Sequence, residues 1–215
     1  MDQVILEACC HGTRIAERGR RTKPADRRVI VDEVCRAVAP LDRQVYPTTM
    51  LDILIRAPRA GDGDGLARCW LDAGAYYAAI NPALFQVPQA DGLGQWFEER
   101  LGAASDNRPM LVAEKDGQVA GYVLATIQHP SPAAPRNFLR KVGQVRAYVD
   151  ILVVQDAYRR HGIGTRLMEA VEEWARDRGA SVVLLDTYIG SDLSVPFYER
   201  RMGYNRRALR FSKTL

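Results

Sequence analysis

The sequence lacks the features that mark membrane and secreted proteins. It contains no run of eighteen or more apolar residues, and charges interrupt the first thirty residues, which excludes the apolar core of a signal peptide. Only four cysteines occur, and their spacings fit neither a zinc ribbon nor a CxxC redox pair: Cys9, Cys10, Cys35 and Cys69. We therefore expect a cytoplasmic chain with reduced thiols, no membrane partner and no bound metal.

A strong charge of one sign is also missing. The formal net charge is only +4, and acidic residues are interspersed along the chain, which argues against a dedicated nucleic-acid surface. The length of 215 residues, 47% of them hydrophobic, is enough to bury one full core but leaves little room for two complete domains. One domain with an extension is the expected organisation.

Residues 1–49 differ from the rest of the chain. They are rich in arginine and contain two short helical patterns, around Val4 to Arg18 and Val29 to Ala39. We interpret them as an N-terminal extension of unknown role, partly helical or disordered, followed by a folded domain over residues 50–215. An upstream start, with Met50 as an alternative first residue, fits the same sequence.

Strand and helix signals alternate from Leu51 onward. The strand signal "LDILIRA" precedes "GDGDG", where Asp62 or Asp64 can cap a helix over "LARCWLDAGAYYAAI". A second helix is expected in "LGQWFEERLG". The segment "MLVAEKDGQVAGYVLATI" predicts a β-hairpin, because two β-branched runs flank "KDGQ".

The second half of the domain predicts a strand-helix-strand unit. The strand "AYVDILVV" precedes an amphipathic helix from Ile163, which ends near Gly179, and "SVVLLDT" then predicts a buried strand. A short helix with Pro196 in its first turn and a final strand after Gly203 complete the chain. The fold class is therefore mixed αβ (α+β).

The segment "RRHGIG", directly before this helix, has the chemistry of an anion site. The first turn of a helix leaves backbone N–H groups without partners, Gly162 and Gly164 allow close approach, and Arg159 and Arg160 add positive charge. The segment lacks the lysine of a P-loop, and Leu167 stands where a dinucleotide fingerprint needs its third glycine. A glycine turn without a ligand is the alternative interpretation.

The stretch "VDILVVQDAYRRHGIGTRLMEAVEEWA" resembles motif A of the GNAT superfamily of N-acetyltransferases, whose Gln/Arg-x-x-Gly-x-Gly/Ala pattern is met by Arg159, Gly162 and Gly164. The segment "FYERRMGY" is similar to a second family signature, in the expected order and separation. The resemblance extends over nearly all of residues 51–215. It implies a central, largely antiparallel mixed sheet flanked by helices.

The resemblance also implies acetyl-CoA as cosubstrate. Its pyrophosphate is then expected at the loop before the helix, and its pantetheine arm along the preceding strand, where the Leu152 N–H polarises the thioester carbonyl. Seven residues before Tyr198, Ser191 stands where the family often has an asparagine that contacts the cofactor. The implied cofactor-binding residues are Leu152, Val153, Val154, Arg159, Arg160, His161, Gly162, Ile163, Gly164, Thr165 and Ser191.

By the same resemblance, Asp150 and Tyr198 are the candidate catalytic residues. Tyr198 matches the tyrosine that serves as general acid beside the cofactor sulfur. A carboxylate at the position of Asp150 acts as base in members with polyamine-like substrates, but its pKa of about 3.9 is far below the value of about 10.4 for an amine. It is therefore expected to relay a proton through water or attract the cation, and a purely structural role is the alternative. Tyr148 shares the strand face of Asp150 and is the alternative base or a substrate contact.

The resemblance implies a primary amine of a small molecule or a peptide as the acceptor. Tyr76, Tyr77 and Phe85 are candidate acceptor contacts, although aromatic residues at this spacing also suit a core. The basic residues of the later loop (Arg136, Arg140 and Lys141) favour an acceptor that carries a carboxylate or phosphate. The rival function is a non-catalytic acyl-CoA-binding regulatory module, and family members often form homodimers.

Overall fold

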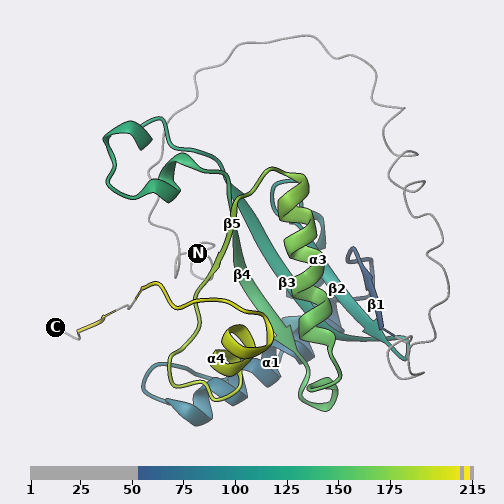
Figure 1. Cartoon of the computed structure of the whole chain (residues 1–215). Coiled ribbons are helices and arrows are strands. Elements are labelled where there is room, and N and C mark those ends of the chain that lie inside the picture. Colours follow the sequence, from purple (N-terminus) through teal and green to yellow (C-terminus); the bar gives the residue numbers. More distant parts are fainter. Residues whose placement is uncertain (1–52, 209–210, 214–215) are drawn as a thin grey trace, which may run out of the picture. The chain divides into compact units, whose positions relative to one another are not determined.

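The computed structural model describes residues 53–208 and 211–213. The predicted extension over residues 1–49 and the boundary at Met50 lie outside this part of the chain. Five strands form one sheet in the order β1-β2-β3-β4-β5, antiparallel except for the parallel pair β4 and β5 (Figure 1). The strands are β1 (Ile53–Arg56), β2 (Met110–Lys115), β3 (Gln118–Gln128), β4 (Arg146–Val154) and β5 (Val182–Leu185).

Helices cover both faces of this sheet. On one face α3 buries Leu167 and Val171 against β-strand side chains, and on the other α1 and α2 bury Leu66 and Phe97 in a second core around Tyr122. No helix within the described ranges is long and apolar enough to cross a membrane. The helices are α1 (Gly63–Ile80), α2 (Leu93–Glu98), α3 (Ile163–Asp177) and α4 (Ser194–Pro196), with short turns η2 (Leu101–Ala103), η3 (Ala134–Arg136), η4 (Arg140–Gly143), η5 (Asp156–Tyr158) and η6 (Phe197–Arg201).

The predicted hairpin is confirmed by β2 and β3. Asp116 and Gly117 join the strands with φ angles of 53° and 73°. A two-residue turn with both φ angles positive matches the right-handed twist of the strands, and aspartate followed by glycine favours it. The predicted ends of α3 are confirmed as well, because Gly179 adopts a φ of 74° one residue after the C-cap.

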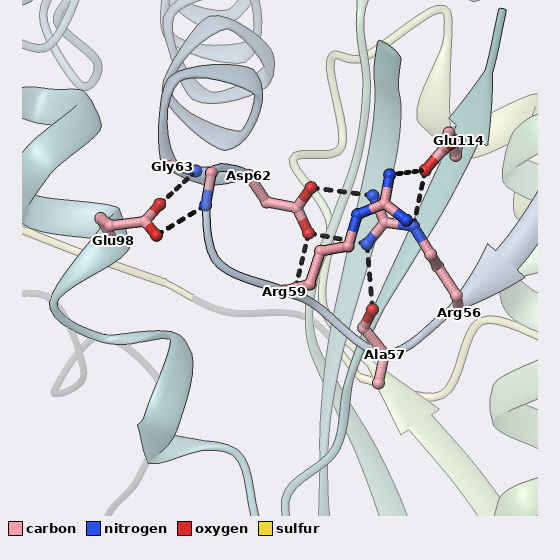
Figure 2. Close-up of polar contacts among 8 residues, drawn as sticks. Arg56, Ala57, Arg59, Asp62, Gly63, Glu98 and Glu114 are labelled. Atoms are coloured by element: carbon pink, nitrogen blue, oxygen red, sulfur yellow. Dashed lines mark hydrogen bonds and ion pairs between the residues drawn. The ribbon is translucent and has the colours of Figure 1, made fainter. Parts of the chain in front are cut away.

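The start of α1 differs from the prediction in how it is capped. Asp62 occupies the N-cap position, but its side chain makes no capping bond and instead accepts hydrogen bonds from the Arg56 guanidinium at 2.7 and 2.8 Å (Figure 2). Glu98 of α2 accepts from the Gly61 and Gly63 N–H groups instead. A partner distant in sequence therefore satisfies the helix end, while Asp62 neutralises a half-buried arginine.

Two predictions about the C-terminal part are wrong. The strand β5 is half-buried rather than buried, because it lies at an edge of the sheet. No strand follows Gly203 within the described residues, where the side chains of 205–208 and 211–213 are exposed. A strand needs a paired neighbour, and none of the described strands pairs with this segment.

Candidate active site

The centre of the candidate site is a bulge in β4. Leu124 of β3 pairs with Ile151, but the next residue, Ala125, pairs with Val149, so Asp150 is an extra residue without a partner. The bulge reverses the alternation of side chains along β4. Odd-numbered Val149 packs in the α3 core before the bulge, and even-numbered Leu152 packs there after it. A local irregularity therefore redirects one carboxylate within an otherwise apolar strand.

At the same point β4 and β5 separate. Their parallel pairing runs from Arg146 and Val182 to Val149 and Leu185 and then ends. Residues 151–154 consequently have no strand neighbour on that side within the described part of the chain. The backbone groups of this edge are available to a ligand that presents amides of its own.

Asp150 lies on the face of the sheet opposite α3. The Thr126 hydroxyl donates to its carboxylate at 2.6 Å, and Thr126 is the pairing partner of Tyr148, so the three side chains share one region of β3 and β4. Burial raises the pKa of the Asp150 carboxyl above its ordinary value, although the Thr126 hydrogen bond and the charge of Arg108 act in the opposite direction. Among the described residues only Thr126 donates to this half-buried carboxylate, so it can also bind a cation or a water molecule.

The N-terminus of α3 has the backbone geometry of an anion cradle. Gly162 is its N-cap, with a φ of 83°, and the preceding Arg160 has a φ of 65°. A side chain at Gly162 would be strained in this conformation, which explains the glycine directly. Arg160 and His161 are exposed, and Ile163 is buried in the α3 core. The first turn, with Gly164 and Thr165, presents N–H groups that lack intrahelical acceptors.

Arg159 is held in place by three contacts. It donates to the Val154 carbonyl at 3.2 Å, pairs with Asp156 at 2.6 Å and lies 5.5 Å above the centre of the Tyr76 ring. Its guanidinium thus connects the end of β4 to α1. A pocket of about 390 Å³ opens beside it and is lined by Tyr76, Asp156, Arg159, Arg160, Asp192 and Leu193.

The three residues predicted along the strand, Leu152, Val153 and Val154, alternate between the two cores. Leu152 and Val154 pack on the α3 side, whereas Val153 is buried on the α1 side. Only their backbone atoms therefore face the gap left by β5. This arrangement fits the predicted role, which requires no polar side chain.

Tyr198 lies in the helical segment formed by α4 and η6, close to the start of α3. A methyl group at Gly164 would lie 3.4 Å from the ring of Phe197, the residue before Tyr198. The segment is wound as a π-helix, with the Met202 N–H donating to the Phe197 carbonyl. Burial and the nearby Tyr77 raise the pKa of the Tyr198 hydroxyl well above its ordinary value, so it stays protonated at neutral pH.

Ser191 is engaged by the protein itself. Its side chain is 2% exposed, its Oγ accepts from the Ser194 N–H at 3.0 Å, and it shares a hydrogen bond with the Tyr76 hydroxyl at 3.0 Å. The Ser191 hydroxyl therefore satisfies the first backbone N–H of α4, although the N-cap position of that helix is Leu193. The predicted hydrogen bond from this hydroxyl to the cofactor competes with both contacts.

The candidate acceptor residues Tyr76, Tyr77 and Phe85 form one aromatic cluster. Tyr76 and Tyr77 meet edge to face, and Phe85 contacts both Tyr77 and Tyr188. The Tyr77 hydroxyl and Ser194 Oγ are 3.0 Å apart, so the cluster connects α1 to α4. Much of this aromatic surface therefore serves packing between elements.

Sequence reasoning missed Thr126 and Tyr188. Thr126 is a polar residue in the run "VLATIQ", on the face opposite the buried Ala125 and Ile127, so the two-residue period could have revealed it. Tyr188, in the loop after β5, has no comparable signal. Its hydroxyl accepts from the Asn81 side chain at 3.0 Å, a contact between segments 107 residues apart.

The profile of the Acetyltransferase (GNAT) family matches residues 71–204, more than half of the chain. The chain belongs to this family. Its match includes the bulge at Asp150, the α3 N-terminus and the Tyr198 segment. The family, the mixed αβ fold class and the acetyltransferase class predicted from the sequence are therefore confirmed.

Individual relatives share only parts of this GNAT sequence. N-alpha-acetyltransferase 30 of Schizosaccharomyces pombe is 34% identical over 62 residues, which are 29% of this chain and 41% of that protein. The matched region thus spans less than half of that relative. That name describes the relative's activity and does not by itself define the acceptor here.

Solved structures show the same fold at low identity. A tetramutant of the BH1408 protein from Bacillus halodurans aligns with a TM-score of 0.64 and 17% identity, over 75% of this chain and 99% of that one. A transcriptional regulator from Bacillus halodurans C-125 aligns with a TM-score of 0.56 and 19% identity, over 76% and 99%. These likenesses support the arrangement of the sheet and helices.

Proposed function

We propose that this GNAT protein transfers an acetyl group from acetyl-CoA to a primary amine of a small molecule or a peptide, by direct attack of the amine. The observation that carries the proposal is the coincidence of three features at the end of β4: the bulge at Asp150, the separation from β5 and the glycine-capped start of α3. Each feature answers a different chemical requirement of the reaction.

The residues at this end of β4 fit acetyl-CoA. The positive φ of Gly162 and the N–H groups at the start of α3 suit a pyrophosphate, and Arg159 and Arg160 line the adjoining pocket. The edge of residues 151–154 from which β5 has separated suits the amides of a pantetheine arm. When bound, acetyl-CoA supplies a thioester that is already activated for acyl transfer, and the Leu152 N–H is the proposed donor to its carbonyl oxygen.

Asp150 is proposed to bind the acceptor amine and to assist its deprotonation. An ammonium group must lose a proton before it attacks, and its ordinary pKa of about 10.4 is too high for direct removal by a carboxylate. Asp150 instead attracts the ammonium group and orients a water molecule, through which the ammonium proton leaves to bulk solvent. Within the described residues its carboxylate accepts one hydrogen bond, from Thr126, which leaves lone pairs for this purpose.

Tyr198 is proposed to donate a proton to the departing thiolate. Its raised pKa keeps the hydroxyl protonated throughout the neutral range, and no hydrogen bond occupies this hydroxyl within residues 53–208 and 211–213. The side chain packs against the same core as Leu152 and Val154. A general acid in this role contributes about 10² to 10⁴ in rate.

The experiment that tests the function combines turnover with binding. Thiol release from acetyl-CoA is measured over a panel of primary amines and peptides, and acetyl-CoA affinity is measured separately by calorimetry. Release that depends on an added amine supports acetyl transfer. Tight acetyl-CoA binding without turnover on any amine would support the rival function, a non-catalytic acyl-CoA-binding regulatory module.

A further inference from the structure

The loop that connects β3 to β4, residues 129–145, has an unusual charge distribution. It contains Arg136, Arg140 and Lys141, and β4 begins with Arg146, yet no aspartate or glutamate occurs from residue 129 to residue 149. The loop includes η3 and η4 and projects from the sheet at the end where β4 begins (Figure 1). We call residues 129–145 the basic loop.

The basic loop offers its side chains to solvent. Arg136, Arg140 and Lys141 are exposed, and none of them forms an ion pair with another residue in the described part of the chain. Phe138 is 93% exposed between these cations, and Leu139 is 44% exposed. An aromatic side chain among unpaired cations has no packing role, and it is typical of a recognition surface for an anionic, partly apolar partner.

Arg146 links this loop to the candidate active site. Its Nη1 donates to the Lys141 carbonyl at 3.0 Å, while its Nε is buried and has no hydrogen-bond partner within the described residues. Ala147 and Val149 face the α3 side, so Arg146 and Tyr148 project from the opposite face, where Thr126 contacts Asp150. A cation, a hydroxyl and a carboxylate thus follow one another along β4.

We propose that the acceptor is a peptide whose amino terminus lies at Asp150 and whose acidic side chains, from about the third to the fifth residue, are recognised by Arg146 and the basic loop. Asp150 and Arg146 are four positions apart on β4. At the rise of a strand this is about 13 Å, which an extended peptide covers in about four residues. Phe138 covers an apolar side chain of the same peptide. This inference rests on the proposed function and specifies its acceptor.

Charge explains why the partner is acidic, and position explains why it is the acceptor. A polycationic acceptor would be repelled by the unpaired arginines and lysine. The loop leads directly into the strand that carries Asp150, so a ligand bound to the loop points toward the bulge. The cations alone would also suit an anionic membrane or an RNA strand, and the connection of the loop to β4 is what favours a peptide acceptor.

The test uses octapeptides with a free amino terminus that differ only at positions three and four, which are both glutamate, both glutamine or both lysine. The kcat/KM with acetyl-CoA and the affinity of fluorescein-labelled forms are measured at low and high salt. We expect the glutamate peptide to exceed the glutamine peptide at least about tenfold in both quantities at low salt, and the lysine peptide to rank last.

The variant Arg140→Gln/Lys141→Gln should lower the values for the glutamate peptide to those for the glutamine peptide. Arg146→Gln and Phe138→Ser give independent variants of the same surface. The matched control is Arg68→Gln, which removes one exposed charge from α1 and should leave the ratio unchanged. Binding is read without turnover, so the recognition surface is tested even if no peptide is acetylated.

Equal kcat/KM and affinity for all three peptides would overturn the acceptor inference and leave acetyl transfer standing. Binding of the glutamate peptide without its acetylation would instead count against the proposed function. Phosphatidylserine vesicles and a single-stranded RNA serve as competing probes. The inference is wrong if either binds through Arg140 and Lys141 while the peptides show no preference.

Discussion

The hydroxyl of Thr126 donates a 2.6 Å hydrogen bond to the carboxylate of Asp150 across the bulged pair of β3 and β4. This contact gives the extra residue of the bulge a defined direction. It also opposes the effect of burial, because a hydrogen bond to the charged form lowers the pKa of a carboxyl. The acidity of the proposed catalytic carboxylate therefore depends on a neighbouring strand.

Replacing Thr126 by valine should move the acidic limb of the pH profile of kcat/KM to higher pH. The hydrogen bond lowers the pKa of Asp150 and burial raises it. When the hydrogen bond is removed, the pKa rises further, and a larger fraction of Asp150 is protonated near neutral pH. The shift should be about one pH unit, and it is measured from kcat/KM for acetyl-CoA at a fixed, saturating concentration of one amine. Thr126→Ser retains the hydroxyl and is the control; a profile unchanged in Thr126→Val would contradict the role of Asp150.

Asp150→Asn should lower activity and raise stability at neutral pH. A carboxyl whose pKa is raised on folding binds its proton more tightly in the folded state, so its ionisation destabilises the fold as pH rises above the unfolded value of 3.8. The asparagine variant avoids this cost, and we expect a melting temperature higher by about 2 °C at pH 7.5. The gain should disappear near pH 3.5, where both side chains are neutral. A lower melting temperature at pH 7.5 would sink this account.

Tyr198→Phe should reduce kcat about 100-fold or more and leave the affinity for acetyl-CoA nearly unchanged, because only the proton donor is removed. Tyr204→Phe is the matched control. The Tyr204 hydroxyl donates to Glu172 at 2.8 Å, so its loss should reduce stability by about 1 kcal/mol with little effect on kcat. Comparable kcat values for Tyr198→Phe and the wild type would exclude the general-acid role.

The anion site is best tested at Thr165 rather than at Gly162, whose positive φ makes any side chain strained. Thr165 lies in the first turn of α3, and in the part of the chain that the structure describes its hydroxyl accepts only a long contact, 3.4 Å, from Arg201. An aspartate here favours the helix but repels a phosphate. Thr165→Asp should therefore bind acetyl-CoA at least about tenfold more weakly than Thr165→Asn in calorimetry, with an equal or higher melting temperature. Equal affinities of the two variants would contradict the assignment of the pyrophosphate to this site.

Arg56→Met should destabilise the fold by about 3 kcal/mol at pH 7, measured by urea unfolding, because it leaves the buried Asp62 without its cation and Glu114 with only the exposed Arg59 as partner. Burial alone would raise the pKa of Asp62, but Arg56 and the Arg59 N–H hold it below its ordinary value. That stability is present above pH 3.8 and is lost as pH falls through the folded pKa. The difference between wild type and variant should therefore narrow toward pH 3, and Arg56→Met/Asp62→Asn should recover part of the loss.

Local chemistry explains what could be predicted from the sequence alone. Three features depend on residues within a few positions of one another. They are the Asp116–Gly117 turn, the apolar stripe of α3 with its glycine ends, and the pattern within each family motif. Neighbours in sequence are always neighbours in space, so such signals are readable without a fold. They were enough to indicate the family, the mixed sheet and the position of Gly162.

Only the tertiary structure decided which groups remain free for chemistry. The bond from Thr126 to the bulged Asp150, the engagement of the Ser191 hydroxyl by Tyr76 of α1, and the capping of α1 by Glu98 all join segments that are distant in the sequence. A polar side chain takes the partner that folding brings within hydrogen-bond reach, and burial then determines its acidity. The spacing of residues along the chain predicts neither the hydrogen-bond partner of a side chain nor its burial.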